Sequence, residues 1–179
     1  MEIQNLNEKT VSTQEIYNGR IIKVRNDKVE LPNGNHAARE VVKHSGGVCV
    51  VPLTDDGKVV MVKQYRYPFG EVLLEIPAGK LEYGEDPLQC GKRELLEETG
   101  YISEKFEFLG KLYPTPAYCT EVIHMYLARG LHAGKAELDV DEFLEVVEIP
   151  FEETVNMVMR NEIADAKTQI ALLRTCLLK

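Results

Sequence analysis

The sequence predicts an α/β protein: a mixed β-sheet with helices packed on it, and a small antiparallel β region at the N-terminus. Two observations favour this fold class. Segments rich in β-branched residues and separated by turn signals fill the first third of the chain, and apolar residues recur at helical spacing near its end. The 179 residues suit one compact domain with a small appendage. We therefore expect an N-terminal β region over residues 1–45 and a main domain over 46–179.

Turn signals place the first strands. Pro-Asn-Gly-Asn at 32–35 predicts a turn between two strands, and Thr-Asp-Asp-Gly at 54–57 predicts a second hairpin. A further short strand is expected to end at Pro77. The strands expected in this part of the chain are 20–31, 38–44, 46–53, 58–65 and 71–77.

A helix is expected between residues 86 and 100. Asp86 is a good N-cap, Pro87 fits the first turn, and Gln89 can complete a capping box. Gly100 is a suitable C-terminal stop. The elements expected after this helix are strands at 106–113, 121–128 and 143–149, a loop at 114–120, and amphipathic helices at 150–160 and 165–178.

Three glutamates gather on one face of the 86–100 helix. At about 100° per residue, Glu98 lies near +40° and Glu97 near −60° from Glu94, whereas the leucines of the helix lie on the other side. Like charges at this spacing cost a few tenths of a kcal/mol per pair. The face is therefore either solvated or it binds a cation, and hard divalent ions such as Mg²⁺ prefer oxygen ligands of this kind.

Composition excludes several classes of protein. The formal net charge of −8 argues against nucleic acid as the main partner, because a polyanion is bound by a surplus of Lys and Arg. No apolar run approaches the roughly 20 residues that span a bilayer, and the first ten residues lack the features of a secretion signal. The four cysteines have no metal-ligand spacing, so we expect free thiols and a cytoplasmic location.

The acidic helix and the loop before it carry a motif with fixed gaps. Its residues are Gly79, Glu85, Arg93, Glu94, Leu95, Glu97, Glu98, Gly100 and Tyr101. This pattern resembles the signature of the Nudix hydrolases, with Tyr101 as the one loose match. The resemblance implies an α/β/α sandwich around a mixed sheet. It also implies hydrolysis, dependent on Mg²⁺ or Mn²⁺, of a nucleoside diphosphate linked to another moiety.

The resemblance assigns roles to several of these residues. By analogy, Glu94, Glu97 and Glu98 are metal ligands, together with the main-chain oxygen of Ala78. Arg93 resembles the partner of Glu85 in a pair that fixes the loop to the helix.

The catalytic group implied by the resemblance is Arg93, Glu97 and a base from the acidic loop before a late strand. Glu142 is the expected base. Asp141 and Asp139 are alternatives, because Val140 stands where an acid is often found.

The flanking segments resemble the subgroup that cleaves ADP-ribose. Pro116 lies fifteen residues beyond Tyr101, as a proline does in that subgroup, although Thr-Pro-Ala replaces the usual Ser-Pro-Gly. By analogy, Arg39 and Arg66 hold the pyrophosphate and Glu75 contacts the adenosine side.

The resemblance leaves other features of the subgroup as expectations. Tyr17 either stacks on adenine or packs against the fold. The subgroup also suggests a homodimer with exchanged N-terminal strands. Hydrolysis of other nucleotide sugars or of dinucleoside polyphosphates stays open, as does a non-catalytic nucleotide-binding module.

Overall fold

The computed structural model describes residues 5–134 and 143–178, and its backbone contacts divide the chain into two units. The N-terminal unit comprises residues 1–45 together with 113–121, and the larger unit comprises 46–112 and 122–179. Residues 113–121 contain the predicted Pro116 loop, so this loop groups with the N-terminal strands rather than with the strands that precede and follow it in the chain.

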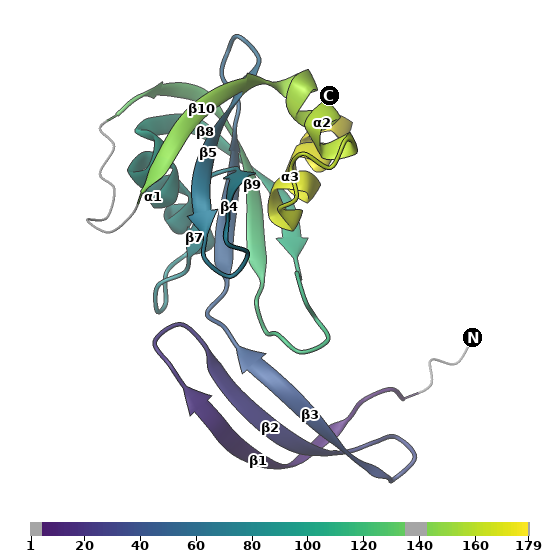
Figure 1. The fold of residues 1–179 in the computed structure, drawn as a ribbon. Coiled ribbons are helices and arrows are strands. Elements are labelled where there is room, and N and C mark those ends of the chain that lie inside the picture. The colour runs from purple at the N-terminus through teal and green to yellow at the C-terminus, as the bar shows by residue number, and fades with distance from the viewer. Residues whose placement is uncertain (1–4, 135–142, 179) are drawn as a thin grey trace. The chain divides into compact units, whose positions relative to one another are not determined.

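The N-terminal unit is an antiparallel sheet of three strands: β1 (Lys9–Asn18), β2 (Lys23–Glu30) and β3 (His36–Lys43), in that order (Figure 1). The strands predicted on either side of the 32–35 turn are confirmed as β2 and β3. The sequence did not predict β1. Two register shifts, between Thr10 and Ser12 and between Glu15 and Tyr17, interrupt its alternation, so it has no period of two to recognise.

The 113–121 segment is joined to β3 by backbone hydrogen bonds. The N–H of Val42 donates to the carbonyl of Tyr118 at 2.7 Å, and the N–H of Thr120 donates to the carbonyl of Val42 at 2.9 Å. The segment therefore runs beside β3 as a short parallel bridge.

The described residues of the larger unit form two sheets. The first has the order β7-β4-β9-β8 and the second has the order β10-β5-β6. The first is mixed, since β4 runs parallel to β9 and antiparallel to β7. Their bounds are β4 (Gly47–Pro52), β5 (Lys58–Arg66), β6 (Glu71–Glu75), β7 (Ala78–Lys80), β8 (Tyr101–Leu112), β9 (Ile123–Ala133) and β10 (Leu144–Pro150).

The 54–57 turn does not form the predicted hairpin between two paired strands. It forms as a turn, with the N–H of Gly57 donating to the carbonyl of Thr54 at 3.0 Å, but β4 and β5 enter different sheets. The reason is that β4 already has β7 on one edge and β9 on the other, so only the bridge between Leu53 and Val59 joins it to β5. The strand predicted to end at Pro77 forms as β6, which ends at Glu75, and a separate strand, β7, begins at Ala78 in the other sheet.

Helices cover the sheets on two sides, which confirms the expected α/β/α arrangement (Figure 1). The helices are α1 (Pro87–Thr99), α2 (Phe151–Met159) and α3 (Ala166–Leu177). Strand β4 is buried throughout and alternates between two cores. Val48 and Val50 pack in the core that contains Leu95 of α1, whereas Cys49 and Val51 pack in the core of α2 and α3.

The ends of α1 follow the predicted capping. The side chain of Asp86 accepts the backbone N–H groups of Leu88 and Gln89, and Gly100 adopts φ 72° while its N–H donates to the carbonyl of Leu96. A left-handed residue at this position favours glycine, because other residues are strained there. The caps fix where α1 begins and ends, and therefore which glutamates it presents.

Candidate active site

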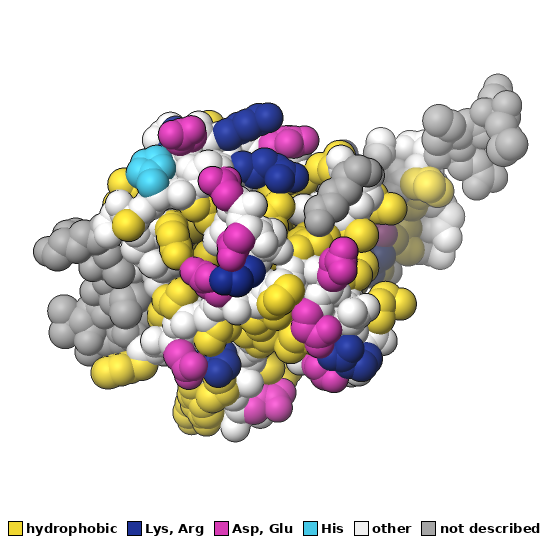
Figure 2. Space-filling view, turned by 90° about the horizontal axis from the view of Figure 1, so that it is seen from above, with side chains coloured by type: hydrophobic (Ala, Val, Ile, Leu, Met, Phe, Trp, Pro, Cys, Tyr) yellow, Lys and Arg dark blue, Asp and Glu magenta, His cyan; other side chains and the backbone are white. Residues whose placement is uncertain are grey.

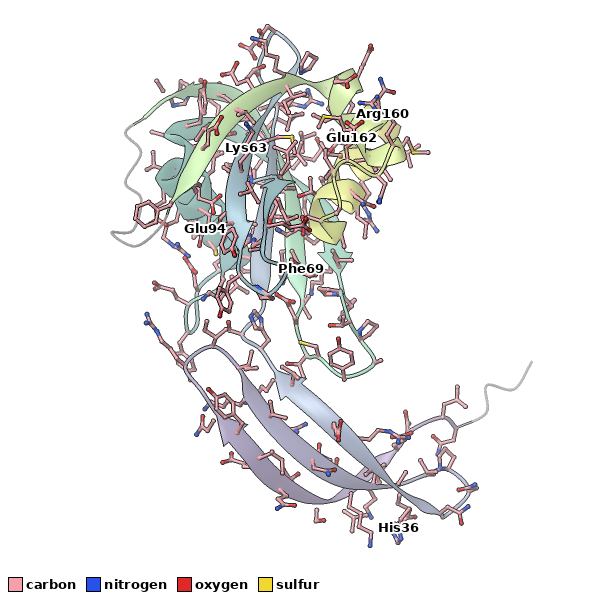
Figure 3. The ribbon with its side chains drawn as sticks, viewed as in Figure 1. His36, Lys63, Phe69, Glu94, Arg160 and Glu162 are labelled. Carbon is pink, nitrogen blue, oxygen red and sulfur yellow. The ribbon has the colours of Figure 1, made fainter. Side chains whose placement is uncertain are left out.

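Two of the three glutamates on the acidic face of α1, Glu94 and Glu98, lie against β7. Glu98 is only 2% exposed, and its carboxylate accepts the backbone N–H of Ala78 at 3.1 Å. Glu94, labelled in Figure 3, lies against Gly79. A Cβ added at Gly79 would stand 1.8 Å from the Glu94 Oε1 atom. A purely solvated face therefore does not describe Glu98 or Glu94.

Arg93 is the centre of the ion pairs on this face. Its guanidinium donates to both carboxylate oxygens of Glu85, at 3.0 and 3.1 Å. Its Nη1 atom also donates to Glu94 at 2.8 Å and to Glu97 at 2.9 Å. The hydrogen bond from Arg93 lowers the pKa of Glu85 to about 2, and the same bond is the largest cause that raises the pKa of Arg93. The loop before α1 is thus tied to the helix by one side chain.

The donor atoms of this face suit a hard divalent cation. Glu94, Glu97 and Glu98 offer only oxygen, as does the backbone carbonyl of Ala78, and Mg²⁺ prefers such ligands. Across residues 5–134 and 143–178, however, no three acidic, histidine or cysteine side chains converge closely enough to hold an ion. Each of the three carboxylates accepts a hydrogen bond through one of its oxygens, Glu94 and Glu97 from Arg93 and Glu98 from the Ala78 N–H.

A second cluster joins the ends of β5 and β6 to α3. The Nε and Nη2 atoms of Arg66 donate to the two oxygens of Glu75, each at 2.6 Å. Glu75 is 1% exposed, and Lys167 also contacts its carboxylate. Burial alone would raise the pKa of Glu75, but Arg66 and Lys167 hold it below the ordinary value.

The short segment between Glu75 and Gly79 connects the two clusters through its backbone. The N–H of Ile76 donates to Thr168 Oγ1 at 3.1 Å, and the carbonyl of Pro77 accepts the N–H of Val50 at 2.9 Å. The N–H of Ala78 donates to Glu98, as above. Successive residues that lead from one sheet to the other are therefore held by α3, β4 and α1 in turn.

Charge also links the clusters. The pKa of Arg66 is raised, chiefly by its hydrogen bonds to Glu75 and further by the charges of Asp165 and Glu98. The negative charge of Glu98 on α1 therefore acts on the guanidinium of Arg66. The predicted phosphate ligand Arg66 and the predicted metal ligand Glu98 belong to one region of the larger unit.

The remaining predicted residues lie elsewhere in the chain. Arg39, Tyr17 and Pro116 belong to the N-terminal unit. Arg39 donates to Glu8 at 2.9 and 2.5 Å, and Tyr17 is exposed with its ring against Gly19. Pro116 lies in a turn in which the N–H of Cys119 donates to the carbonyl of Thr115 at 3.0 Å. The expected base Glu142 and its alternatives Asp141 and Asp139 lie outside the described residues.

Sequence reasoning missed Lys167 and Thr168. Both lie in the first turn of α3, which was predicted only as an amphipathic helix. One signal was available: a cation in the first turn of a helix opposes the helix dipole, so Lys167 needs nearby carboxylates to be favourable there.

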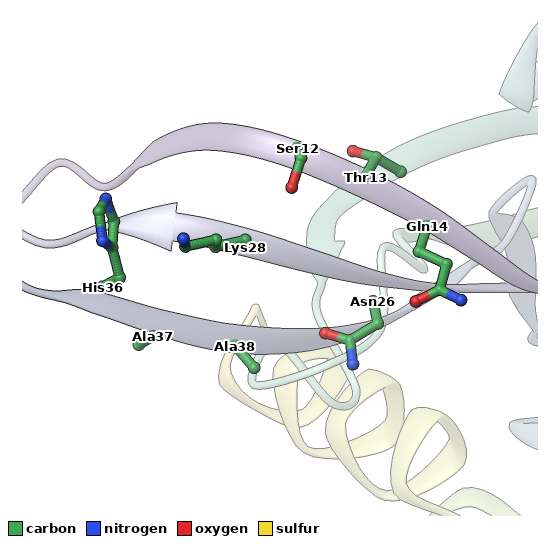
Figure 4. A pocket seen from close by; sticks show the side chains of 8 residues that line it. All are labelled: Ser12, Thr13, Gln14, Asn26, Lys28, His36, Ala37 and Ala38. Atoms are coloured by element: carbon green, nitrogen blue, oxygen red, sulfur yellow. The ribbon is translucent and has the colours of Figure 1, made fainter.

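A shallow, open depression in the N-terminal sheet does not coincide with these clusters. Polar side chains, a lysine, a histidine and two alanines line it, among them Gln14, Asn26, Lys28 and His36 (Figure 4). None of the predicted site residues forms part of its wall.

Two further observations concern the partners that the composition excluded. On the face drawn in Figure 2, acidic side chains are interspersed with Lys and Arg, and no continuous basic stripe is visible. Within the part of the chain that the structure describes, no helix is long and apolar enough to cross a membrane.

Residues 43–171 match the NUDIX domain, and residues 8–42 match the nucleoside diphosphate sugar hydrolase N-terminal domain. An ADP-ribose pyrophosphatase of Bacillus subtilis (strain 168) is 44% identical over 172 residues, which cover 95% of this chain and 93% of that protein. A methanol dehydrogenase activator of Bacillus methanolicus is 46% identical over 167 residues, covering 92% and 90%.

Among solved structures, the crystal structure of an ADP compounds hydrolase superposes with a TM-score of 0.87. The alignment covers 98% of this chain and 96% of that one at 21% sequence identity, and it supports the fold.

Proposed function

Because this chain belongs to the NUDIX family, we propose that it is an enzyme that hydrolyses the pyrophosphate bond of ADP-ribose to AMP and ribose 5-phosphate. The observation that carries the proposal is the complete acidic face of α1, held against β7 in a chain 44% identical to an ADP-ribose pyrophosphatase. The family is dependent on divalent metal ions.

We assign the metal ion to Glu94, Glu97, Glu98 and the main-chain oxygen of Ala78, with Mg²⁺ preferred and Mn²⁺ as the alternative. When bound there, such an ion neutralises phosphate charge and lowers the pKa of a coordinated water. Arg93 keeps the carboxylates of Glu94 and Glu97 together before the ion binds, which reduces the repulsion between them.

Arg66 is proposed to bind the pyrophosphate. Two of its nitrogens are fixed on Glu75, and the third, Nη1, makes no hydrogen bond to residues 5–134 or 143–178 and is proposed to meet a phosphate oxygen, with 36% of the side chain exposed. A planar guanidinium suits phosphate well when its orientation is fixed.

Other assignments rest on the resemblance and stay predictions. These are a second pyrophosphate contact from Arg39, an adenosine-side contact from Glu75, and contributions from Tyr17 and Pro116. The same holds for Glu142 as the base that takes the proton of the attacking water.

Replacing Glu98 by Gln tests the proposal with little change of shape. The amide oxygen can still accept the Ala78 N–H, but the negative charge is lost. We expect kcat for ADP-ribose hydrolysis to fall by about two to three orders of magnitude. The matched control is Glu162→Gln, which alters an exposed glutamate paired with Arg160 at 2.7 Å (Figure 3). Wild-type turnover in a folded Glu98→Gln variant would remove the metal assignment.

A panel of substrates separates the alternatives. ADP-ribose, GDP-mannose, another nucleotide sugar and a diadenosine polyphosphate are each incubated with Mg²⁺, and the products are separated by chromatography. Preference for ADP-ribose supports the proposal, whereas faster cleavage of another compound reassigns the substrate. Nucleotide binding with no product from any of them would make the chain a binding module.

We also propose that the protein is a cytoplasmic homodimer with exchanged N-terminal strands. The support is β1, an edge strand of ten residues, all exposed, that carries Val11, Ile16 and Tyr17. An unpaired strand edge is a template for pairing with another chain. Free thiols at all four cysteines agree with a reducing compartment. Sedimentation at low concentration tests the dimer, and a fully active monomer would end this part of the proposal.

A further inference from the structure

The first turn of α3 reaches the segment that joins the two sheets of the larger unit. Asp165 caps the helix by accepting the backbone N–H of Thr168 at 2.9 Å. The next two polar side chains point to consecutive residues of that segment: Lys167 contacts the Glu75 carboxylate, and Thr168 Oγ1 accepts the N–H of Ile76. One helical turn therefore holds two consecutive residues that lie 92 positions earlier in the chain.

Glu75 lies between two cations. Arg66 donates to both of its oxygens, and Lys167 contacts one of them. Lys167 also lies 3.1 Å from Asp165, so two cations and two carboxylates form a neutral group. If Glu75 lost one of these cations, its buried negative charge would be only partly compensated, and its carboxylate would be held less firmly in place.

Lys167 is itself unavailable to a substrate. Its side chain is 13% exposed, and its ammonium group is engaged by Glu75 and Asp165. Burial alone would lower the pKa of Lys167, but the charges of Asp165 and Glu75 hold it above the ordinary value. It therefore remains a cation at neutral pH. Because it contacts Glu75, and Glu75 accepts both hydrogen bonds from Arg66, Lys167 acts on Arg66 through Glu75.

We propose that Lys167 is a positioning residue for substrate binding, which acts through Glu75 to fix the guanidinium of Arg66 against the pyrophosphate. The inference rests on the proposed function, in which Arg66 binds phosphate. Thr168 adds a second contact, because the hydrogen bond that its Oγ1 atom accepts from the Ile76 N–H holds the backbone two residues before Ala78.

Lys167→Met tests the inference, because it removes the charge and keeps a chain of similar length. We expect KM for ADP-ribose to rise about tenfold while kcat changes less than about threefold, since the lost interaction orients a binding group. Lys167→Arg restores a cation and should return KM to within about threefold of wild type. If Lys167→Met does not fold, Lys167→Gln takes its place, with the same expected rise in KM.

Lys58→Met is the matched control. Lys58 also bridges two carboxylates, Asp56 at 2.8 Å and Glu148 at 3.4 Å, but it is 39% exposed and contacts no predicted site residue in the described part of the chain. Its KM should equal that of wild type. An equal rise in KM for Lys58→Met would show that loss of any bridging lysine has this effect, and would overturn the inference.

Arg66→Met, alone and combined with Lys167→Met, separates this inference from the proposed function. If Lys167 acts through Arg66, Lys167→Met raises KM in the wild type and adds nothing in the Arg66→Met background. A KM unchanged by Arg66→Met would refute the phosphate role of Arg66 in the proposed function. If Arg66→Met raises KM and Lys167→Met does not, or if the two effects multiply, Lys167 is not a positioning residue.

Discussion

Gly79 stands where no side chain fits beside the carboxylate of Glu94. A Cβ at this position would lie 1.8 Å from Glu94 Oε1 and 1.9 Å from its Cδ. Ordinary contacts begin at 3.4 Å, so in Gly79→Ala the carboxylate must move by about 1.6 Å, the difference between the two distances. The neighbour is the end of a flexible side chain, which can rotate away without displacing the backbone.

The size of the effect follows from what Glu94 loses when it moves. Its 2.8 Å ion pair with Arg93 is broken, and because Arg93 is partly exposed this should cost about 1 kcal/mol of stability. A chain of this size would then unfold about 2–4 °C lower. Activity should fall far more. Displacing a proposed metal ligand by more than 1 Å should lower kcat/KM about 100-fold, or about 2.7 kcal/mol.

Steady-state hydrolysis of ADP-ribose with Mg²⁺ and thermal unfolding are measured on Gly79→Ala, Glu94→Ala and the double variant. Truncating Glu94 removes the clash, so adding Gly79→Ala to Glu94→Ala should cost little further stability, while activity stays low. Wild-type kcat/KM in Gly79→Ala would refute the reasoning. So would a Gly79→Ala destabilisation that is as large in the Glu94→Ala background, because the clash would then lie elsewhere.

Three further predictions follow from the same region. The pKa of Glu85 is about 2 in the folded protein, against an ordinary value of 4.5. Its pair with Arg93 therefore stabilises the fold fully above pH 4.5, and this stabilisation is lost as the pH falls toward 2. Urea unfolding should therefore show that Glu85→Gln costs stability at pH 7 but much less at pH 3; an equal loss at both values would contradict the pairing. Gly100→Ala should cost about 1 kcal/mol and lower the unfolding temperature, because φ is 72° at this C-cap, and an unchanged melting curve would refute the strain. Chelation of divalent ions should abolish hydrolysis, and added Mg²⁺ should restore it; turnover that persists in the chelator would remove the metal from the mechanism.

Local sequence accounts for α1 and its acidic face. Asp86 and Gly100 act on backbone groups within a few residues. The rotation of about 100° per residue brings Glu94, Glu97 and Glu98 to one side of the helix. These effects depend on near neighbours in the chain, so the spacing was sufficient to predict them. The resemblance to the Nudix signature rests on the same spacing, and the match of residues 43–171 to the NUDIX domain agrees with it.

Pairing between distant segments was beyond sequence reasoning. The strands β4 and β5 are adjacent in the chain and join different sheets, because β4 is paired on both edges by strands from elsewhere. The two register shifts of β1 interrupt the alternation by which a strand is recognised. In both cases the sheet pairing depends on which strand supplies the hydrogen-bond partners and in which register, and the residue types do not reveal this.

The sequence by itself determined which side chains carry the charge of the site, because helix periodicity and capping are set by neighbours in the chain. Only the tertiary structure decided how the buried charges of Glu98 and Glu75 are compensated. The burial of Glu98 under the Ala78 N–H and the pairing of Glu75 with Lys167 join residues 20 and 92 positions apart. Such contacts depend on how α1 and α3 pack around the junction of the two sheets. Because Glu75 and Glu98 are almost fully buried there, each of them needs a hydrogen-bond partner in that packing.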